Sequence, residues 1–464
     1  MSFFRKKSLA AVKESSSDSS LSKTLTAYDL ILFGLGAIVG TGVFVLTGTV
    51  AAQYSGPAVT ISYAIAGMTC IFVALAYTEV ASMLPTSGSV YTYSYVAFGE
   101  IFAWVMGAIL VIEMCLGAST VSAGWSAYVQ GLLEARGIFL PESISKIPAD
   151  GGLVNLPAVL ITLVVGFVLY LGTKDSKKLN AILVFLKMGA ILIFMIAAAP
   201  YFELSNWENF MPFGFDDVLV GSSILFFSFT GFGALASTAE ECKNPKRDLM
   251  IGIIGSLLLA TIIYVIIGGL ATGITPYYNL NNAEPLAKAL RLNGSNIGSI
   301  LVATGAICGM TTVIMMNIYA QSRIFYVMAR DGLLPKFFSK IHPKYDNPFI
   351  TIMIFTAITA ILGGLFPYNI LGQLSSMGAL LDYIAVIIIV MLFRYQYPEV
   401  KRSFKCPMLY VIAPIALFAC VYLIFKQIIG KHGEALITGK ILGFYLLTAL
   451  ILYFVRKPSI KSDI

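Results

Sequence analysis

Apolar residues fill the chain in long stretches, and short polar segments separate these stretches. A stretch of about 20 apolar residues is the length that an α-helix needs to cross a bilayer. Twelve such stretches start near Tyr28, Pro57, Ile101, Leu156, Ala181, Val218, Met250, Asn296, Phe349, Gly372, Leu409 and Ile437. The pattern therefore predicts an all-α integral membrane protein with twelve transmembrane helices, called spans one to twelve below.

The composition excludes an array of soluble domains. Of the 464 residues, 58% are hydrophobic and 12% are charged, whereas soluble domains carry about 25% charged residues. The mean hydropathy of +0.84 extends over the whole length, so most of the chain must be surrounded by lipid or by other apolar helices.

The distribution of basic residues predicts the orientation. Of the 31 Lys and Arg residues, 23 lie in the two tails and alternate loops, 7 lie in the opposite connections, and Lys187 lies inside a span. By the positive-inside rule, both termini are cytoplasmic, in an inner or plasma membrane. The net charge of +7 is spread loop by loop and forms no single patch, so it does not indicate nucleic-acid binding.

The spans divide into two sets of five and a remaining pair. The sets cover 28–202 and 203–396, and the pair covers 397–455. Residues 1–27 are polar, basic and rich in serine, without the layout of a signal peptide, so they predict a disordered cytoplasmic tail. A second cytoplasmic tail is expected at 456–464.

Glycine clusters interrupt spans one and six, which are corresponding members of the two sets. Gly34 to Gly42 holds four glycines, and Phe229 to Gly233 holds two. Glycine in the middle of a span weakens the helix, and the freed backbone groups are tolerated only where they line a cavity. Inverted-repeat transporters place two broken helices and their substrate at such positions. One alternative is close packing of helices through small residues. The other is a dinucleotide-binding fingerprint, which is disfavoured because no strand precedes the glycines.

Five segments carry a resemblance to a known family. They read GLGAIVGTGVFV in span one, YTEVASMLPTSGSVYTYSYVAFGE after span two, KDSKKLNAILVFLKMGAILIF into span five, FFSFTGFGALASTAEECKNPKRDL in span six and AQSRIFYVMARDGLLPKFFSKIHPKYDNPF after span eight. In these the chain resembles the amino acid-polyamine-organocation (APC) transporters, and within them the cationic amino acid transporters with their bacterial relatives. The resemblance implies a leucine-transporter-like fold, a five-plus-five inverted repeat with two C-terminal helices, and alternating-access transport of amino acids.

The same resemblance implies a substrate site at the two breaks. The substrate carboxylate should meet the backbone amides of Thr41 and Gly42, where a half-helix N-terminus attracts anions. The ammonium should meet the carbonyl groups of Ile38, Phe227 and Thr230, which lie at helix breaks. Phe227 also matches an aromatic gate over the substrate.

Lys187 lies about 10 Å in from the cytoplasmic end of span five, at about 1.5 Å per residue from Asn180. From that depth a lysine either snorkels to the interface or is buried and exchanges a proton. The resemblance favours proton coupling, because a lysine here takes the place of sodium in related transporters.

Three further polar residues lie within spans. Glu113 begins a small and polar stripe on span three, so it should face the bundle, either as a group that tunes proton coupling and the pocket or as a hydrogen-bonded helix tether. Asn317 is a candidate for the pocket. Asp382 in span ten is expected to hold helices together.

Acidic and basic residues also gather near the cytoplasmic helix ends. Glu79, Glu240, Glu241 and Arg323 are expected to be solvated there, with ion pairs that close the inner exit as the alternative. Span six departs from the family, because relatives often have an aspartate at the position of Gly233. Without that acid, a neutral substrate is favoured.

These observations predict a secondary transporter, a proton-coupled symporter that takes up neutral amino acids. A cationic amino acid carrier or an antiporter is the alternative within transport. The isolated ionisable residues disfavour an enzyme, and no catalytic residue is assigned; a channel is also disfavoured. The cysteines are scattered singly and both histidines lie in polar connections, so no metal or cofactor is expected. Beyond substrate, protons and lipid, no obligatory protein partner is evident.

Overall fold

A computed structural model describes residues 5–9, 23–282, 284–400, 402, 404–429 and 434–455. These residues are mostly helical, none of them lies in a strand, and a single bridge pairs Leu25 with Cys242. The expected tails fall mostly outside the described residues, as does the connection around His432.

The main helices follow the predicted stretches closely. In chain order they are α2 (Ala27–Ile38), η1 (Gly42–Leu46), α3 (Thr47–Val50), η2 (Ala51–Ser55), α4 (Val59–Met83), α5 (Ser89–Ala97), α6 (Glu100–Val111), η4 (Ile112–Leu116), α7 (Gly117–Glu134), α9 (Leu156–Tyr170), α10 (Thr173–Ala198), α11 (Phe215–Leu225), η8 (Phe226–Phe229), η9 (Phe232–Glu241), α12 (Pro245–Ile274), α13 (Pro285–Leu292), α14 (Asn296–Arg330), α15 (Phe349–Leu365), α16 (Tyr368–Gln396), α17 (Leu409–Ile429) and α18 (Glu434–Val455).

Within the described part of the chain, nine helical stretches are long and apolar enough to cross a membrane, and α2, α9 and α15 are shorter apolar helices. One of the nine, Gly42–Met83, doubles back on itself, since the Thr47 and Tyr63 hydroxyls lie 2.7 Å apart. The chain is thus a multi-pass membrane protein. The count of twelve crossings and the inverted repeat stay predictions.

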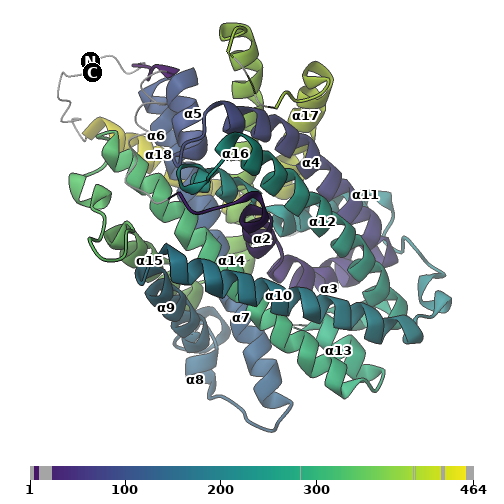
Figure 1. Cartoon of the computed structure of the whole chain (residues 1–464). Coiled ribbons are helices and arrows are strands. Elements are labelled where there is room, and N and C mark those ends of the chain that lie inside the picture. The colour runs from purple at the N-terminus through teal and green to yellow at the C-terminus, as the bar shows by residue number, and fades with distance from the viewer. Residues whose placement is uncertain are drawn as a thin grey trace.

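The two halves of the chain interlock around α2. This helix packs against α10, α12 and α14, and it lies near the middle of the bundle in Figure 1. The α4 helix of the first half packs along α12 of the second, and α10 packs along α14. A site at the end of α2 is therefore enclosed by both halves.

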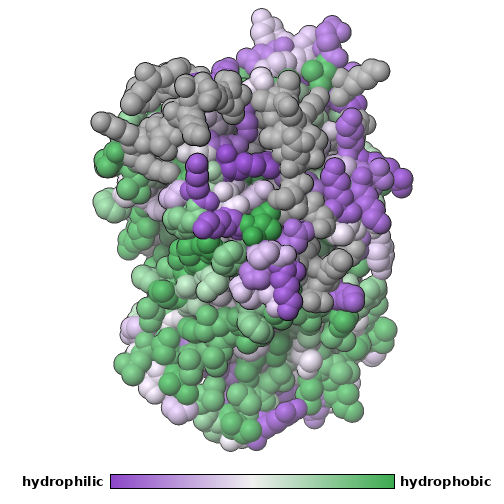
Figure 2. Space-filling view, turned by 60° about the vertical axis from the view of Figure 1, so that its left-hand side comes forward, coloured by the Kyte–Doolittle hydropathy of each residue, from purple (hydrophilic) through white to green (hydrophobic). Residues whose placement is uncertain are grey.

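The outer surface of the bundle is apolar over a wide area. Figure 2 shows hydrophobic residues covering most of the lower part of one face, with polar residues gathered toward the top. Large apolar side chains such as Phe167, Ile196 and Phe444 are more than half exposed. Such a surface needs lipid as its solvent.

Buried ion pairs join the helices at one end of the bundle. Arg323 on α14 binds Glu241 on η9 at 2.9 Å, with both side chains at most 2% exposed. Arg330 binds Glu240, and Arg394 and Arg402 both bind Glu79. The expectation of solvated helix ends is therefore wrong, because each carboxylate has an arginine from another element within reach.

The N-terminal segment joins the same end of the bundle. Lys7 pairs with Asp331 at 2.5 Å, and Leu25 is fully buried. The disorder expected for residues 1–27 thus does not extend to these two described parts of the tail.

Candidate functional site

The first helix break opens the backbone of span one at its centre. The α2 helix ends at Ile38, Val39 is extended, and helical structure resumes at Thr41. The first hydrogen bond of the new segment runs from Phe44 N–H to the Gly40 carbonyl at 3.2 Å. The amide groups of the residues between, including Gly42, therefore precede the first helical bond and form a half-helix N-terminus.

The second break lies directly beside the first. The η8 segment ends at Phe229, Thr230 is extended, and Gly231 has φ +107°, a conformation that favours glycine. A Cβ on Gly231 would lie 2.9 Å from the Ala37 carbonyl oxygen, so the two breaks touch. Beyond the break, η9 continues as a 3₁₀-helix of ten residues, although such runs rarely exceed three or four.

A cavity of about 20 Å³ lies between the two breaks. All six residues that the sequence predicts for substrate binding line it: Ile38, Thr41, Gly42, Phe227, Thr230 and Asn317. This volume holds about one water molecule, so an amino acid requires the walls to move apart. The structure brings the predicted residues together in a closed arrangement, and their roles stay predictions.

The polar groups of this cavity differ in whether they already have hydrogen-bond partners. The hydroxyls of Thr41 and Ser228 are buried without a hydrogen-bond partner in the described residues. The Phe227 carbonyl already accepts two bonds, from the backbone N–H of Thr230 at 3.2 Å and from its hydroxyl at 2.8 Å. The free donors and the half-helix N-terminus therefore offer more to a carboxylate than the Phe227 carbonyl offers to an ammonium.

Lys187 is fully buried on the other side of α2 and does not line the cavity. Its Nζ has four acceptors within hydrogen-bond distance for its three N–H groups: the carbonyls of Leu35 at 2.7 Å, Gly36 at 3.3 Å and Val39 at 2.8 Å, and the Thr312 hydroxyl at 2.9 Å. Snorkelling to the interface is therefore wrong for this lysine. The ammonium instead ties span five to the open end of α2.

Glu113 lines the cavity from the π-helical segment η4 and is 3% exposed. Its Oε2 has no hydrogen-bond partner among the described residues. Its backbone carbonyl accepts a bond from the Ser375 hydroxyl at 2.6 Å. The bundle-facing prediction is confirmed, but the hydrogen-bonded tether runs through the backbone and not through the carboxyl.

Two tyrosines that were not predicted from the sequence form hydrogen bonds to the helix breaks. The single O–H of Tyr264 lies between the carbonyls of Ile38 at 2.8 Å and Ser228 at 3.1 Å, so it bridges the two breaks. The Tyr63 hydroxyl donates to the Gly42 carbonyl at 3.0 Å. A tyrosine inside an apolar span is the available signal, because a buried phenol needs a hydrogen-bond partner.

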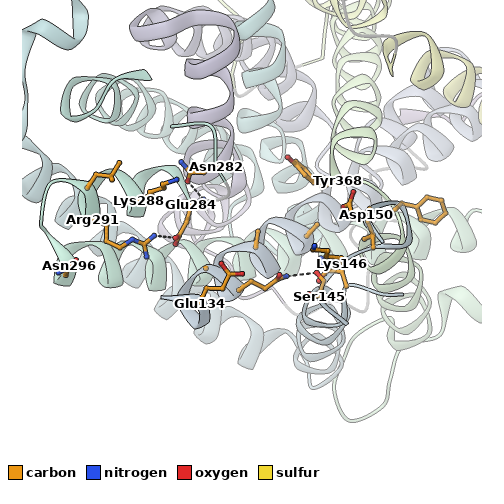
Figure 3. A pocket seen from close by; sticks show the side chains of 18 residues that line it. Glu134, Ser145, Lys146, Asp150, Asn282, Glu284, Lys288, Arg291, Asn296 and Tyr368 are labelled. Carbon is orange, nitrogen blue, oxygen red and sulfur yellow. Dashed lines mark hydrogen bonds and ion pairs between the residues drawn. The ribbon is translucent and has the colours of Figure 1, made fainter. Parts of the chain in front are cut away.

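A vestibule of about 800 Å³ opens at the end of the bundle opposite the ion pairs. Asn296 at the start of α14 lines it, and Arg330 ends the same helix of 35 residues, about 50 Å away. Figure 3 shows charged side chains converging on this space, among them the ion-paired Glu284 and Arg291. Ala123 on α7 lines the vestibule, and Val121 on that helix lines the small cavity. The bundle is thus hollowed at this end, whereas buried ion pairs join its helices at the other end.

Two touching helix breaks with a small cavity between them, in a multi-pass membrane protein, are the arrangement of a transporter with discontinuous helices. The family model for amino acid permeases matches residues 25–452. The chain belongs to the amino acid permease family.

Named relatives resemble the chain over most of its length. A branched-chain amino acid permease of Bacillus subtilis is 41% identical, covering 99% of this chain and 98% of the relative. A methylthioribose transporter of the same organism is 38% identical, covering 92% and 93%. Cationic amino acid transporter 9 of Arabidopsis thaliana is 38% identical, covering 85% and 70%.

Proposed function

We propose that this permease takes up neutral amino acids with apolar, branched side chains. The cavity between the helix breaks supports this most directly. Its half-helix N-terminus at Thr41 and Gly42 suits a carboxylate, and Ile38, Val121 and Val313 present an apolar wall. A substrate held by its backbone groups and surrounded by aliphatic side chains matches a relative named for branched-chain amino acids.

A neutral substrate also follows from the charges around the cavity. Position 233 carries a glycine instead of an acid, and Glu113 is the one acidic or basic residue among the residues that line the cavity. A cationic side chain would need an ionised partner, whereas an aliphatic one only needs apolar surface. The cationic carrier therefore stays the alternative.

Transport is driven by protons that bind at Lys187. The protonated ammonium holds three carbonyl groups at the end of α2 and thereby fixes the substrate-binding break. Loss of the proton removes the charge and one donor, which frees α2 to move. Proton release at one side of the membrane is thus linked to the site's change of access.

The pathway works by alternating access with both termini on the cytoplasmic side. The vestibule then faces outward, and the Arg323–Glu241 and Arg330–Glu240 pairs close the inner exit. Phe227, which lines the cavity, covers the substrate as the gate.

Thermal stabilisation across the twenty amino acids, with methylthioribose as a further ligand, tests the substrate. A ligand raises the melting temperature according to its affinity, and leucine, isoleucine and valine should raise it most. Stabilisation by arginine and lysine instead would favour the cationic carrier, and stabilisation by methylthioribose alone would refute amino acid transport. In proteoliposomes, accumulation on an inward proton gradient without counter-substrate separates a symporter from an antiporter.

A further inference from the structure

Asp382 on α16 is a buried carboxylate that lies behind the break in span six. It is 1% exposed, and neither of its carboxyl oxygens has a hydrogen-bond partner among the described residues. The expectation that it ties helices together is therefore wrong. Its Oδ2 lies 3.8 Å from the point where a Cβ on Gly233 would stand. The carboxyl group thus occupies the space beside the first turn of η9.

Glu113 lies on the same helix interface. A Cβ on Gly378, one turn before Asp382, would lie 3.0 Å from the backbone nitrogen of Glu113. Residues three or four apart share one face of a helix, and Ser375, Gly378 and Asp382 follow this spacing. One face of α16 therefore holds Asp382 and packs against Glu113, whose side chain reaches the substrate cavity.

Among the described residues, the groups around Asp382 supply no cation. The titratable side chains near it are Glu113 from η4, Tyr77 from α4, Tyr93 from α5 and Tyr383 from α16, with the thiols of Cys70 and Cys420 further along α4 and α17. The other charged residues of the helices packed around α16 lie in or near the terminal turns of those helices. Arginines bind Glu79, Glu240 and Glu241 there. The remaining ones, at further helix ends, are Glu100, Glu134, Lys426 and Lys440. Lys187 is held by α2 and Thr312.

Two buried carboxyls without a cation cannot both be ionised cheaply, since each charge is desolvated and the two repel. We propose that Asp382 and Glu113 form a shared proton-binding site that is separate from Lys187. With one proton bound the pair carries a single negative charge, and loss of this proton leaves two. The inference rests on the proposed proton-coupled transport and deepens it, because this site touches both the substrate cavity and the inner half of span six.

Several polar groups lie between this site and the ion-paired end of the bundle. The Tyr77 hydroxyl lies 3.5 Å from the Gly233 carbonyl and 2.6 Å from the Ser89 hydroxyl. The Ser89 backbone N–H donates to the Thr86 carbonyl at 3.2 Å, and the Thr86 hydroxyl donates to Glu240 at 3.3 Å. When the ion pairs of this end separate, a proton leaving Asp382 has polar groups along its way to the cytoplasm.

Infrared spectroscopy of the purified protein tests the site independently of transport. The parent should show the carbonyl stretch of a protonated, buried carboxyl group, and the double variant Asp382→Asn/Glu113→Gln should lack it. Glu142→Gln is the control, because this exposed carboxylate pairs only with Lys146 at the surface. A band that is missing from the parent, or that persists in the double variant, overturns the proposal.

Transport in proteoliposomes tests the function of the site. Asp382→Asn should lose the accumulation that an inward gradient of one pH unit can drive, up to about tenfold at one proton per substrate, and should keep substrate counterflow. Gly233→Asp combined with Asp382→Ala should restore accumulation, since a Cβ at position 233 meets only ordinary contacts, the nearest at 3.5 Å from the Tyr77 hydroxyl.

The outcomes separate this inference from the proposed function. If the parent itself never accumulates substrate on a proton gradient, proton coupling fails, whatever the infrared band shows. If the parent is coupled and Asp382→Asn accumulates substrate equally well, only the acidic site is refuted. Failure of the relocated carboxyl to restore any accumulation also counts against the site.

Discussion

Replacing Lys187 by methionine removes the ammonium and keeps a side chain of similar length. Of the three carbonyls that Nζ contacts, Leu35 still accepts from Val39 N–H at 3.0 Å, and Gly36 still accepts from the Thr312 hydroxyl at 2.9 Å. Only the Val39 carbonyl is left without a described partner. One unsatisfied buried carbonyl costs about 1–3 kcal/mol, and removal of a desolvated charge offsets part of this. The variant should therefore fold.

The expected defect of Lys187→Met is in energy coupling. A gradient of one pH unit is worth about 1.4 kcal/mol, enough for about tenfold accumulation at one proton per substrate. The parent should approach this ratio in proteoliposomes, whereas the variant should equilibrate substrate at a ratio of about one and keep counterflow. Lys187→Arg should fail as well, because guanidinium stays charged and is planar and larger.

Lys178→Met is the matched control, since this lysine is exposed on the same helix. It should accumulate substrate like the parent. If Lys187→Met does the same, the ammonium is only a structural tie between span five and α2, and the assignment of proton coupling to it is refuted.

Three other predictions concern the substrate site and the buried ion pairs. Gly42→Ala should abolish ligand-induced thermal stabilisation, because its Cβ would lie 2.6 Å from the span-six backbone, whereas Gly443→Ala meets nothing within 4 Å and should bind normally. Arg323→Gln leaves the buried Glu241 carboxylate without its ion-pair partner, so it should lower the free energy of unfolding by about 3–5 kcal/mol. It should also make the inner end accessible to cysteine-labelling reagents. Lys146→Gln, which breaks an exposed pair, should change stability by less than about 1 kcal/mol. Amines made by decarboxylating the best substrate should not stabilise the protein, and an amine that binds as tightly would refute carboxylate capture.

The helix breaks can be predicted from the sequence because only glycine tolerates their geometry. Gly231 adopts a left-handed conformation, and Gly42 has span six against it. Both constraints require glycine, and a glycine can be read directly from the sequence. The pairing of the two breaks also follows, because their positions correspond in the two sets of five spans.

The environments of the ionisable residues could not be predicted in the same way. The depth of Lys187 is readable from its distance to the helix end, but its partners depend on which face of α10 meets α2. The nearness of Asp382 to Gly233 joins positions that are far apart in the chain. Only the packing of α16 reveals that no described residue neutralises this carboxylate.

The 3₁₀ geometry of η9 gives the second half of span six a length that depends on how tightly it is wound. Ten residues at a rise of about 2.0 Å extend about 20 Å, whereas the same residues in an α-helix extend about 15 Å. A change of winding alone would draw the Glu241 end about 5 Å toward the break while the chain at Gly231 stays in place. Contraction of this segment would thus pull on the ion pairs that Glu241 and Glu240 form with Arg323 and Arg330.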